Sequence, residues 1–97
     1  MTKQEAKDLE MQIENLLTEN FEAESTIALT LSGYFRIAFD ENYICVKPDG
    51  FKIGYVKFTG FKEDLEDFCN KALLIIRQNK ELFDQLLWSY EHIGELM

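Results

Sequence analysis

Four carboxylates crowd the stretch FKEDLEDFCNKALLII, residues 61–76, just before it turns almost entirely apolar. They are Glu63, Asp64, Glu66 and Asp67. Such a cluster could bind a metal ion, imitate phosphates or open a helix, where each carboxylate gains roughly 0.3–1 kcal/mol from the helix dipole. A metal site would require the side chains to converge, but at helical spacing they fan apart and no calcium-loop spacing is present. We expect the cluster to start a helix first and to serve as an acidic binding surface second.

A tryptophan stands in a second acidic region. Trp88 falls opposite the apolar stripe of the last predicted helix, on a face that also carries Glu81, Asp84, Glu91, His92 and Glu95. An exposed Trp in a charged field is typical of an interface hot spot; the alternative is that Trp88 packs on a neighbouring helix. Leu74 and Met11 also fall off their stripes. The candidate partner-binding residues are Glu63, Glu66, Asp67, Leu74, Asp84, Trp88, Glu91 and Glu95.

Tyrosines and bases interleave in the middle of the chain. The outer face of the predicted sheet carries Tyr34, Arg36, Tyr43, Cys45, Lys47, Lys52, Tyr55 and Lys57. Residues of these types build stacking platforms for single-stranded nucleic acid. They also pair across strands on a solvated sheet, which protects it from aggregation, or contact a protein. Tyr34, Arg36, Tyr43, Lys47, Tyr55 and Lys57 form the alternative binding set.

The sequence offers little for catalysis. Its only histidine, His92, lies near the end of the chain on the acidic outer face, and Cys69 falls on a core stripe, where thiols are inert. GYVKFTG, residues 54–60, lacks the spacing of a phosphate-binding loop. Cys45 and Cys69 are too far apart and too few for a disulfide framework, and three Cys/His residues are too few for a structural zinc site. We expect no enzyme activity, no catalytic residue, no metal, no cofactor and two reduced thiols.

Helical periodicity predicts a first helix over residues 2–19, opened by a capping box of Thr2 and Glu5. Its apolar stripe comprises Ala6, Leu9, Ile13, Leu16, Leu17 and Phe21. Period-two alternation then predicts four strands, with inward Ile27, Leu29, Leu31, Phe35, Ile37, Phe39, Ile44 and Val46. Turns are expected at Ser32-Gly33, residues 40–42 and residues 48–50. A bulge at Gly54 would bring the last strand's apolar residues to one face.

After Thr59-Gly60 the chain returns to helical spacing. The second stripe comprises Phe61, Leu65, Phe68, Cys69, Ala72, Leu73 and Ile76, and the last comprises Leu82, Phe83, Leu86, Tyr90 and Ile93. Asn79 interrupts them and is expected to cap a third helix over residues 80–93; one long helix is the alternative. Gly94 is the expected stop. Residues 1–97 thus read as a single α+β domain: a helix, a four-stranded antiparallel meander, and one or two helices packed on one sheet face.

Charge is unevenly distributed along the 97 residues, whose net charge is −8. Residues 1–25 carry seven acids and two bases, residues 26–60 three acids and four bases, and residues 61–97 eight acids and four bases. This excess disfavours direct nucleic-acid binding and favours encounter with a basic protein. No apolar run reaches the roughly 20 residues that span a membrane, and the polar start is no signal peptide. We expect a cytoplasmic protein.

These observations favour a non-enzymatic, acidic protein-interaction domain whose partner is a basic, nucleic-acid-binding protein. In size, acidity and α+β composition the chain is similar to phage inhibitors of host defence, such as anti-CRISPR and anti-restriction proteins, some of which mimic the charge of DNA; no motif carries this similarity. One alternative is a small structural or accessory subunit that forms a homo-oligomer through the Tyr-rich sheet face or the Trp88 face. The third is a single-stranded nucleic-acid binder that uses the sheet.

Overall fold

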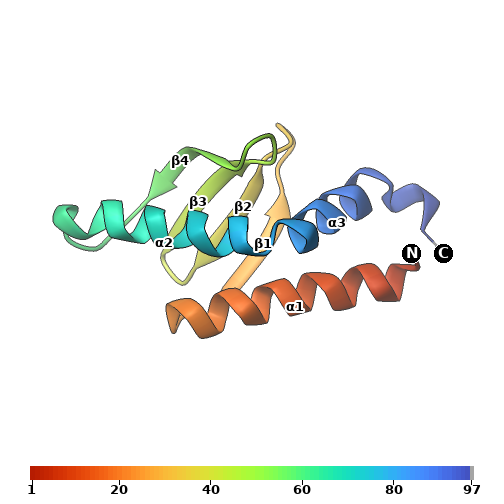
Figure 1. Ribbon diagram of the computed structural model, residues 1–97, viewed down its shortest axis with the longest axis horizontal. Coiled ribbons are helices and arrows are strands. Elements are labelled where there is room, and N and C mark those ends of the chain that lie inside the picture. Colours follow the sequence, from red (N-terminus) through yellow and green to blue (C-terminus); the bar gives the residue numbers. More distant parts are fainter. Residues whose placement is uncertain (97) are drawn as a thin grey trace.

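The computed structural model describes residues 1–96 as an α+β fold of two layers, a sheet and a set of helices (Figure 1). The elements are α1 (Lys3–Phe21), β1 (Ser25–Leu29), β2 (Phe35–Phe39), β3 (Asn42–Lys47), β4 (Lys52–Lys57), the 3₁₀ turn η1 (Lys62–Asp64), α2 (Leu65–Gln78), α3 (Lys80–Glu91) and the 3₁₀ turn η2 (Ile93–Glu95). The sheet is antiparallel in the order β1-β2-β3-β4. The predicted helix, four-stranded meander and C-terminal helices are therefore confirmed.

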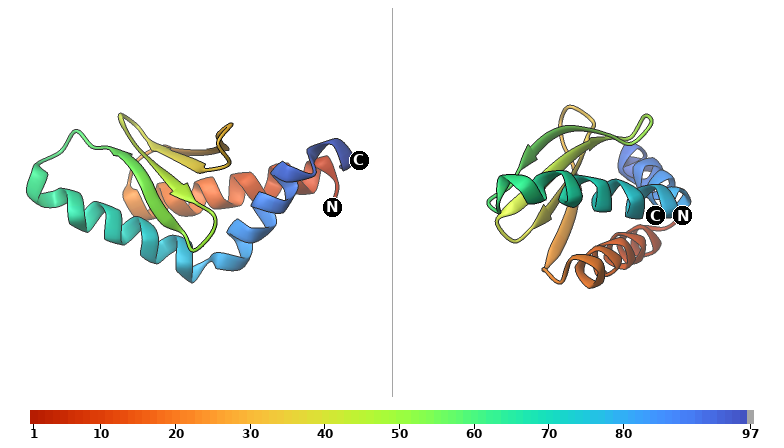
Figure 2. Two further views of the ribbon diagram at one scale, coloured as in Figure 1. Left: turned by 90° about the horizontal axis from the view of Figure 1, so that it is seen from above. Right: turned by 60° about the vertical axis from the view of Figure 1, so that its left-hand side comes forward.

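The molecule is elongated, with extents of 45 × 25 × 23 Å. Figure 2 shows the helices on one side of the sheet, with the other side left uncovered. The start of α1 and the turn η2 lie at the same end of the long axis, and the start of α2 lies at the opposite end (Figure 1).

The first helix begins where the sequence predicts. The Thr2 hydroxyl accepts the Glu5 N–H at 3.1 Å and the Glu5 carboxylate accepts the Thr2 N–H at 3.3 Å, which completes the capping box. The helix continues two residues past its predicted end, to Phe21, and Glu22 terminates it in the left-handed region at φ 51°. Its buried stripe comprises Leu9, Ile13 and Leu17.

The last strand contains the predicted bulge. The pairing register between β3 and β4 shifts between Cys45 and Val46, and Gly54 is the extra residue on β4. Because of this shift, Ile53 and Val56 both pack against the core although they differ in parity.

The β1–β2 turn differs from the prediction. The Gly33 N–H donates to the Thr30 carbonyl at 2.9 Å, and Gly33 takes φ +82°, so the loop has three residues rather than the two of Ser32-Gly33. Since β1 already ends at Leu29, Leu31 lies in this loop and is fully exposed. Its predicted place on the buried face is wrong.

Asn79 separates α2 from α3, which confirms the two-helix alternative. Its N–H donates to the carbonyls of Ile75 and Ile76, and its side-chain amide donates to the Ile75 carbonyl at 2.8 Å. Asn79 therefore caps the end of α2, and the expected side-chain cap at the start of α3 is not formed. The chain bends at this point (Figure 2, left).

Aromatic side chains hold the helices on the sheet. Phe83 of α3 is fully buried and meets Phe35 and Phe51 edge-on, with ring centroids 5.8 and 6.3 Å apart. A second cluster joins α1, β2 and α2 through Phe21, Phe39, Phe58 and Phe68. These contacts fix the positions of α2 and α3 over the inner sheet face.

Two predicted core residues are exposed. Phe61 lies in extended backbone ahead of η1, so it is not on the helix and is 74% exposed. Ile93 is 63% exposed because α3 ends at Glu91, before the stop expected at Gly94, and Ile93 belongs to η2. Both predictions extended a stripe beyond the end of its helix.

Polar side chains of α1 cover the edge of β1. The Glu14 carboxylate accepts the Ile27 N–H at 2.9 Å, and the Thr18 hydroxyl accepts the Ser25 N–H at 3.0 Å. A spacing of four residues places Glu14 and Thr18 on one side of the helix. They therefore accept the backbone N–H groups of β1 that an exposed edge strand would otherwise offer to a strand of another molecule.

Replacing Glu14 by alanine should lower the free energy of unfolding by about 1 kcal/mol, because the half-buried Ile27 N–H loses its acceptor. Urea unfolding followed by circular dichroism measures the change. Glu19→Ala is the matched control, since Glu19 is exposed on the same helix. Equal losses for both variants would show that the edge contact contributes nothing.

Candidate interaction surfaces

Charge is segregated between the two layers. All 18 acidic side chains lie in helices, turns or loops, and none lies in a strand of the described chain. The strands carry four bases, Arg36, Lys47, Lys52 and Lys57. The sheet therefore has a basic outer face, and the helical layer carries most of the acidic charge.

The eight predicted partner-binding side chains are all exposed, but they do not form one compact cluster. Glu63 lies in η1, and Glu66 and Asp67 lie in the first turn of α2. At the other end, Glu91 ends α3 and Glu95 lies in η2. Figure 1 places these two groups toward opposite ends of the long axis. A partner that contacts both must cover an extended surface.

Trp88 faces outward and is 44% exposed. Its ring stacks on His92 of the next helical turn, with centroids 4.3 Å apart and planes at 15°, and His92 Nδ1 lies 2.8 Å from the Trp88 carbonyl. Leu74 and Met11 are about as exposed, at 56% and 50%. The indole is thus held in a defined orientation with nearly half of its surface available to a partner.

The outer sheet face carries a row of stacked side chains. The Arg36 guanidinium lies 4.3 Å from the centre of the Tyr43 ring, and Tyr43 stacks on Tyr55 with centroids 5.6 Å apart. Hydrogen bonding to Tyr55 raises the pKa of Tyr43 above its ordinary value of 10.0. Because Tyr43 is enclosed between two neighbours, this geometry favours cross-strand pairing over an open platform for bases.

A second pair extends the row. Lys47 Nζ lies 6.0 Å from the centre of the Tyr34 ring. A Cβ at Gly54 would come within 2.7 Å of Tyr34 Cε2, so glycine at the bulge lets this ring lie close over β4.

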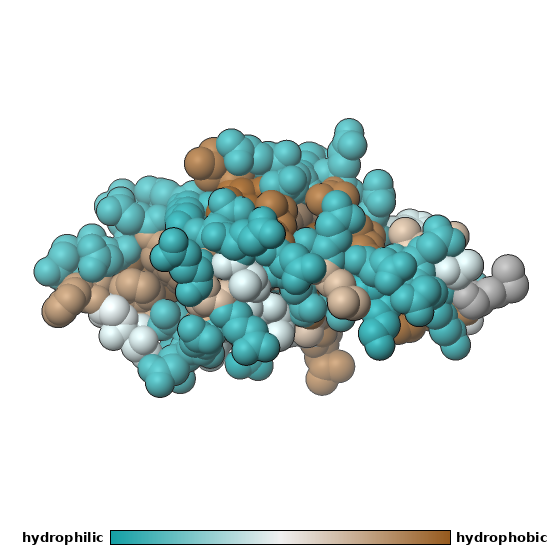
Figure 3. All heavy atoms as spheres, turned by 90° about the horizontal axis from the view of Figure 1, so that it is seen from below, coloured by the Kyte–Doolittle hydropathy of each residue, from teal (hydrophilic) through white to brown (hydrophobic). Residues whose placement is uncertain are grey.

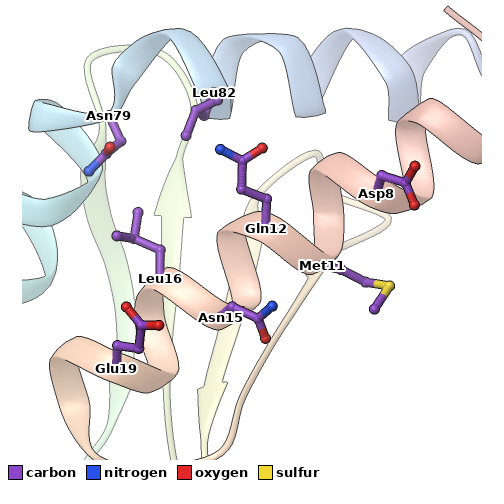
Figure 4. Close-up of a pocket in the computed structure, with 8 residues that line it drawn as sticks. All are labelled: Asp8, Met11, Gln12, Asn15, Leu16, Glu19, Asn79 and Leu82. Carbon is purple, nitrogen blue, oxygen red and sulfur yellow. The ribbon is translucent and has the colours of Figure 1, made fainter.

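Sequence reasoning missed a groove between α1 and the α2–α3 junction, with a volume of about 560 Å³ (Figure 4). We call it the helical groove; it is lined by Asp8, Met11, Gln12, Asn15, Leu16, Glu19, Asn79 and Leu82. Figure 4 shows Gln12 reaching from α1 toward Leu82 of α3. On the face drawn in Figure 3, apolar side chains are visible in patches between polar ones. Two of its residues stand out in the sequence: Met11 is an apolar residue off the stripe of its helix, and Asn79 is a polar residue on an apolar stripe.

Within residues 1–96, no three His, Cys, Asp or Glu side chains gather where they could hold a metal ion. Cys45 and Cys69 are free and half-buried, and burial raises the pKa of the Cys69 thiol, which disfavours the reactive thiolate. None of the helices in residues 1–96 has the length and apolar character needed to cross a membrane.

No protein-family model matches the chain, and no curated protein or solved structure matches it either.

Proposed function

We propose that this protein is a cytoplasmic, non-enzymatic interaction domain whose acidic helical layer docks on a basic, nucleic-acid-binding protein. The segregation of charge carries the proposal, since the strands hold four bases and no acid while the helices, turns and loops hold all 18 acids. The half-buried free thiols suit a reducing compartment.

The shape of the acidic surface supports an inhibitor of the DNA-mimic type. DNA carries one negative charge per roughly 1.7 Å of its axis. The protein is 45 Å long and carries carboxylates at both ends and between them, so it offers a basic cleft a sparser but extended line of negative charge. Such an inhibitor would compete with nucleic acid for the cleft, as some phage anti-defence proteins do, including anti-CRISPR and anti-restriction proteins.

The candidate residues would have two roles. Exposed carboxylates raise the association rate more than they add affinity, and we assign this role to Glu63, Glu66, Asp67, Asp84, Glu91 and Glu95. Trp88 and Leu74 would supply apolar contact, since both expose about half of a large side chain.

The experiment compares the wild type with two variants of equal net charge. The partner is captured from a nuclease-treated host lysate, and its binding kinetics are then measured with the purified proteins at several salt concentrations. The surface variant carries Glu63→Lys, Glu66→Lys and Asp67→Lys. The control variant carries Glu24→Lys, Glu41→Lys and Asp49→Lys, all exposed and outside the proposed surface.

We expect the surface variant to associate about tenfold more slowly and with a flatter salt dependence, because steering by charge is lost. The control variant should retain most of the rate. If both variants associate equally slowly, net charge alone controls the rate and the proposed surface has no special role. An unchanged rate for the surface variant would refute the proposal.

A homo-oligomeric structural subunit is the second candidate. The uncovered basic sheet face favours it, because this face is complementary in charge to the acidic helical layer of another copy. Light scattering after gel filtration would show a dimer or larger species. Single-stranded nucleic-acid binding is the third, and a mobility shift lost on Tyr34→Ala and Tyr55→Ala would support it.

A further inference from the structure

We infer that the helical groove binds a basic amphipathic helix of the partner. This inference rests on the proposed function and names the element of the partner that the acidic layer receives. Helix-in-groove recognition requires an apolar floor and flanking groups that complement the charges of the incoming helix.

The apolar part of the helical groove comes from both sides. Leu16 of α1 and Leu82 of α3 line it and pack against the buried core, so their positions are fixed by the fold. Met11 of α1 also lines the helical groove and is half-exposed, but its side chain points away from Leu82 (Figure 4). Leu16 and Leu82 therefore offer the main contact for the apolar stripe of a docked helix.

The charged part of the helical groove has one sign. Asp8 and Glu19 are its ionisable residues, and no Lys or Arg lines it. The remaining polar side chains are the amides of Gln12, Asn15 and Asn79, which bind either sign of charge. A helix with lysine or arginine on its flanks would therefore be attracted by the carboxylates of Asp8 and Glu19, whereas an acidic helix would be repelled by them.

The spacing of the two carboxylates sets the length of the occupant. Glu19 follows Asp8 by eleven positions on the same helix, which corresponds to about 16 Å at a rise of 1.5 Å per residue. A helix lying along α1 would need about three turns to reach both carboxylates. Basic helices of this length are the elements that many DNA-binding proteins place in the major groove, so their capture would block nucleic-acid binding directly.

The test uses a fluorescent peptide of about 15 residues, made of lysine and leucine with leucines at helical spacing. A second peptide has the same composition in an order without periodicity. Fluorescence anisotropy measures the binding of each to the full-length protein at low and high salt. We expect the periodic peptide to bind at least about tenfold more tightly than the aperiodic one, and to weaken with salt.

Gln12→Arg places a long cation in the helical groove, and it should weaken binding of the periodic peptide by about tenfold or more. Asn70→Arg is the matched control, because it adds the same charge at an exposed position of α2 outside the helical groove. The control should change the affinity by less than about twofold. Circular dichroism melting confirms that both variants are folded.

Equal weakening by the two variants, or equal binding of the two peptides, would overturn the inference, because it would show attraction to net charge alone. A dimer of the wild type that Gln12→Arg dissociates would overturn it too, by showing that a second copy occupies the helical groove. If peptide binding fails while the Glu63, Glu66 and Asp67 variant still loses its partner, only the helical groove is refuted. If the peptide binds there but that variant keeps its partner, only the proposed function is refuted.

Discussion

Replacing Phe83 by alanine should lower the free energy of unfolding by about 3–5 kcal/mol. Phe83 is fully buried, and its ring packs edge-on against Phe35 of β2 and against Phe51, which precedes β4. Removing the ring leaves a cavity where α3 packs on the sheet, at a point that neighbouring rings cannot fill without moving. Because a domain of this size has a stability of about 5–15 kcal/mol in total, the variant should lose a large fraction of its stability.

Urea unfolding followed by circular dichroism measures this loss. Leu74→Ala is the control, because it also truncates a large apolar side chain but at a position that is 56% exposed, where the cost should stay within about 0.5 kcal/mol. The helical groove should also be lost in Phe83→Ala, because Leu82 forms its wall and is adjacent in α3. Similar small losses for both variants would mean that α3 does not dock through Phe83.

The parts of the fold that the sequence predicts are those determined locally. The capping box of Thr2 and Glu5 requires only residues three positions apart. The bulge at Gly54 follows from a change in the parity of apolar residues within one strand. Asn79 marks the end of a helix because a polar residue interrupts an apolar stripe at that position.

The errors occur where an element ends. Periodicity places Leu31, Phe61 and Ile93 on buried faces, but each lies just beyond the strand or helix whose pattern it continues. The end of an element depends on backbone geometry, such as the left-handed Gly33 in the turn after β1, which side-chain hydropathy does not report. Pattern alone therefore overestimates the length of these elements.

Some features of the candidate surfaces can be predicted from the sequence, and others depend on how the elements pack. The exposure of Trp88 and Leu74 and the tyrosine-rich sheet face follow from which side of a helix or strand each residue occupies. The helical groove depends on how α1 lies against the junction at Asn79, and no periodicity encodes that orientation. Glu14 and Thr18 read as surface residues in the sequence, and only packing against β1 shows that they cap a sheet edge.

A change at the α1–α3 contact should have the second-largest effect on stability. The Tyr90 hydroxyl of α3 donates to a Glu10 carboxylate oxygen of α1 at 2.5 Å and lies 3.4 Å from the Ile27 carbonyl of β1. Hydrogen bonds to charged groups contribute about 1.5–3 kcal/mol. Tyr90→Phe should therefore lower the free energy of unfolding by about this amount at neutral pH, because Glu10 loses its donor.

The same contact predicts a dependence on alkaline pH. Burial, followed by the hydrogen bond to Glu10, raises the pKa of Tyr90 above its ordinary value of 10.0. Between that value and the raised pKa, the folded chain keeps the Tyr90 proton while the unfolded chain releases it. The stabilising contribution is therefore complete below about pH 10 and is lost as the pH rises above it.

Urea unfolding between neutral pH and pH 11 should separate this effect from general repulsion. Wild type and Tyr90→Phe should differ most at neutral pH and converge as the pH rises above about 10. Tyr34→Phe is the matched control, because it removes a tyrosine hydroxyl from the outer sheet face, away from the α1–α3 contact. Repulsion in a chain of net charge −8 acts on all three proteins alike, so it leaves the differences unchanged. A constant difference for Tyr90→Phe would show that the Tyr90 proton does not couple to folding.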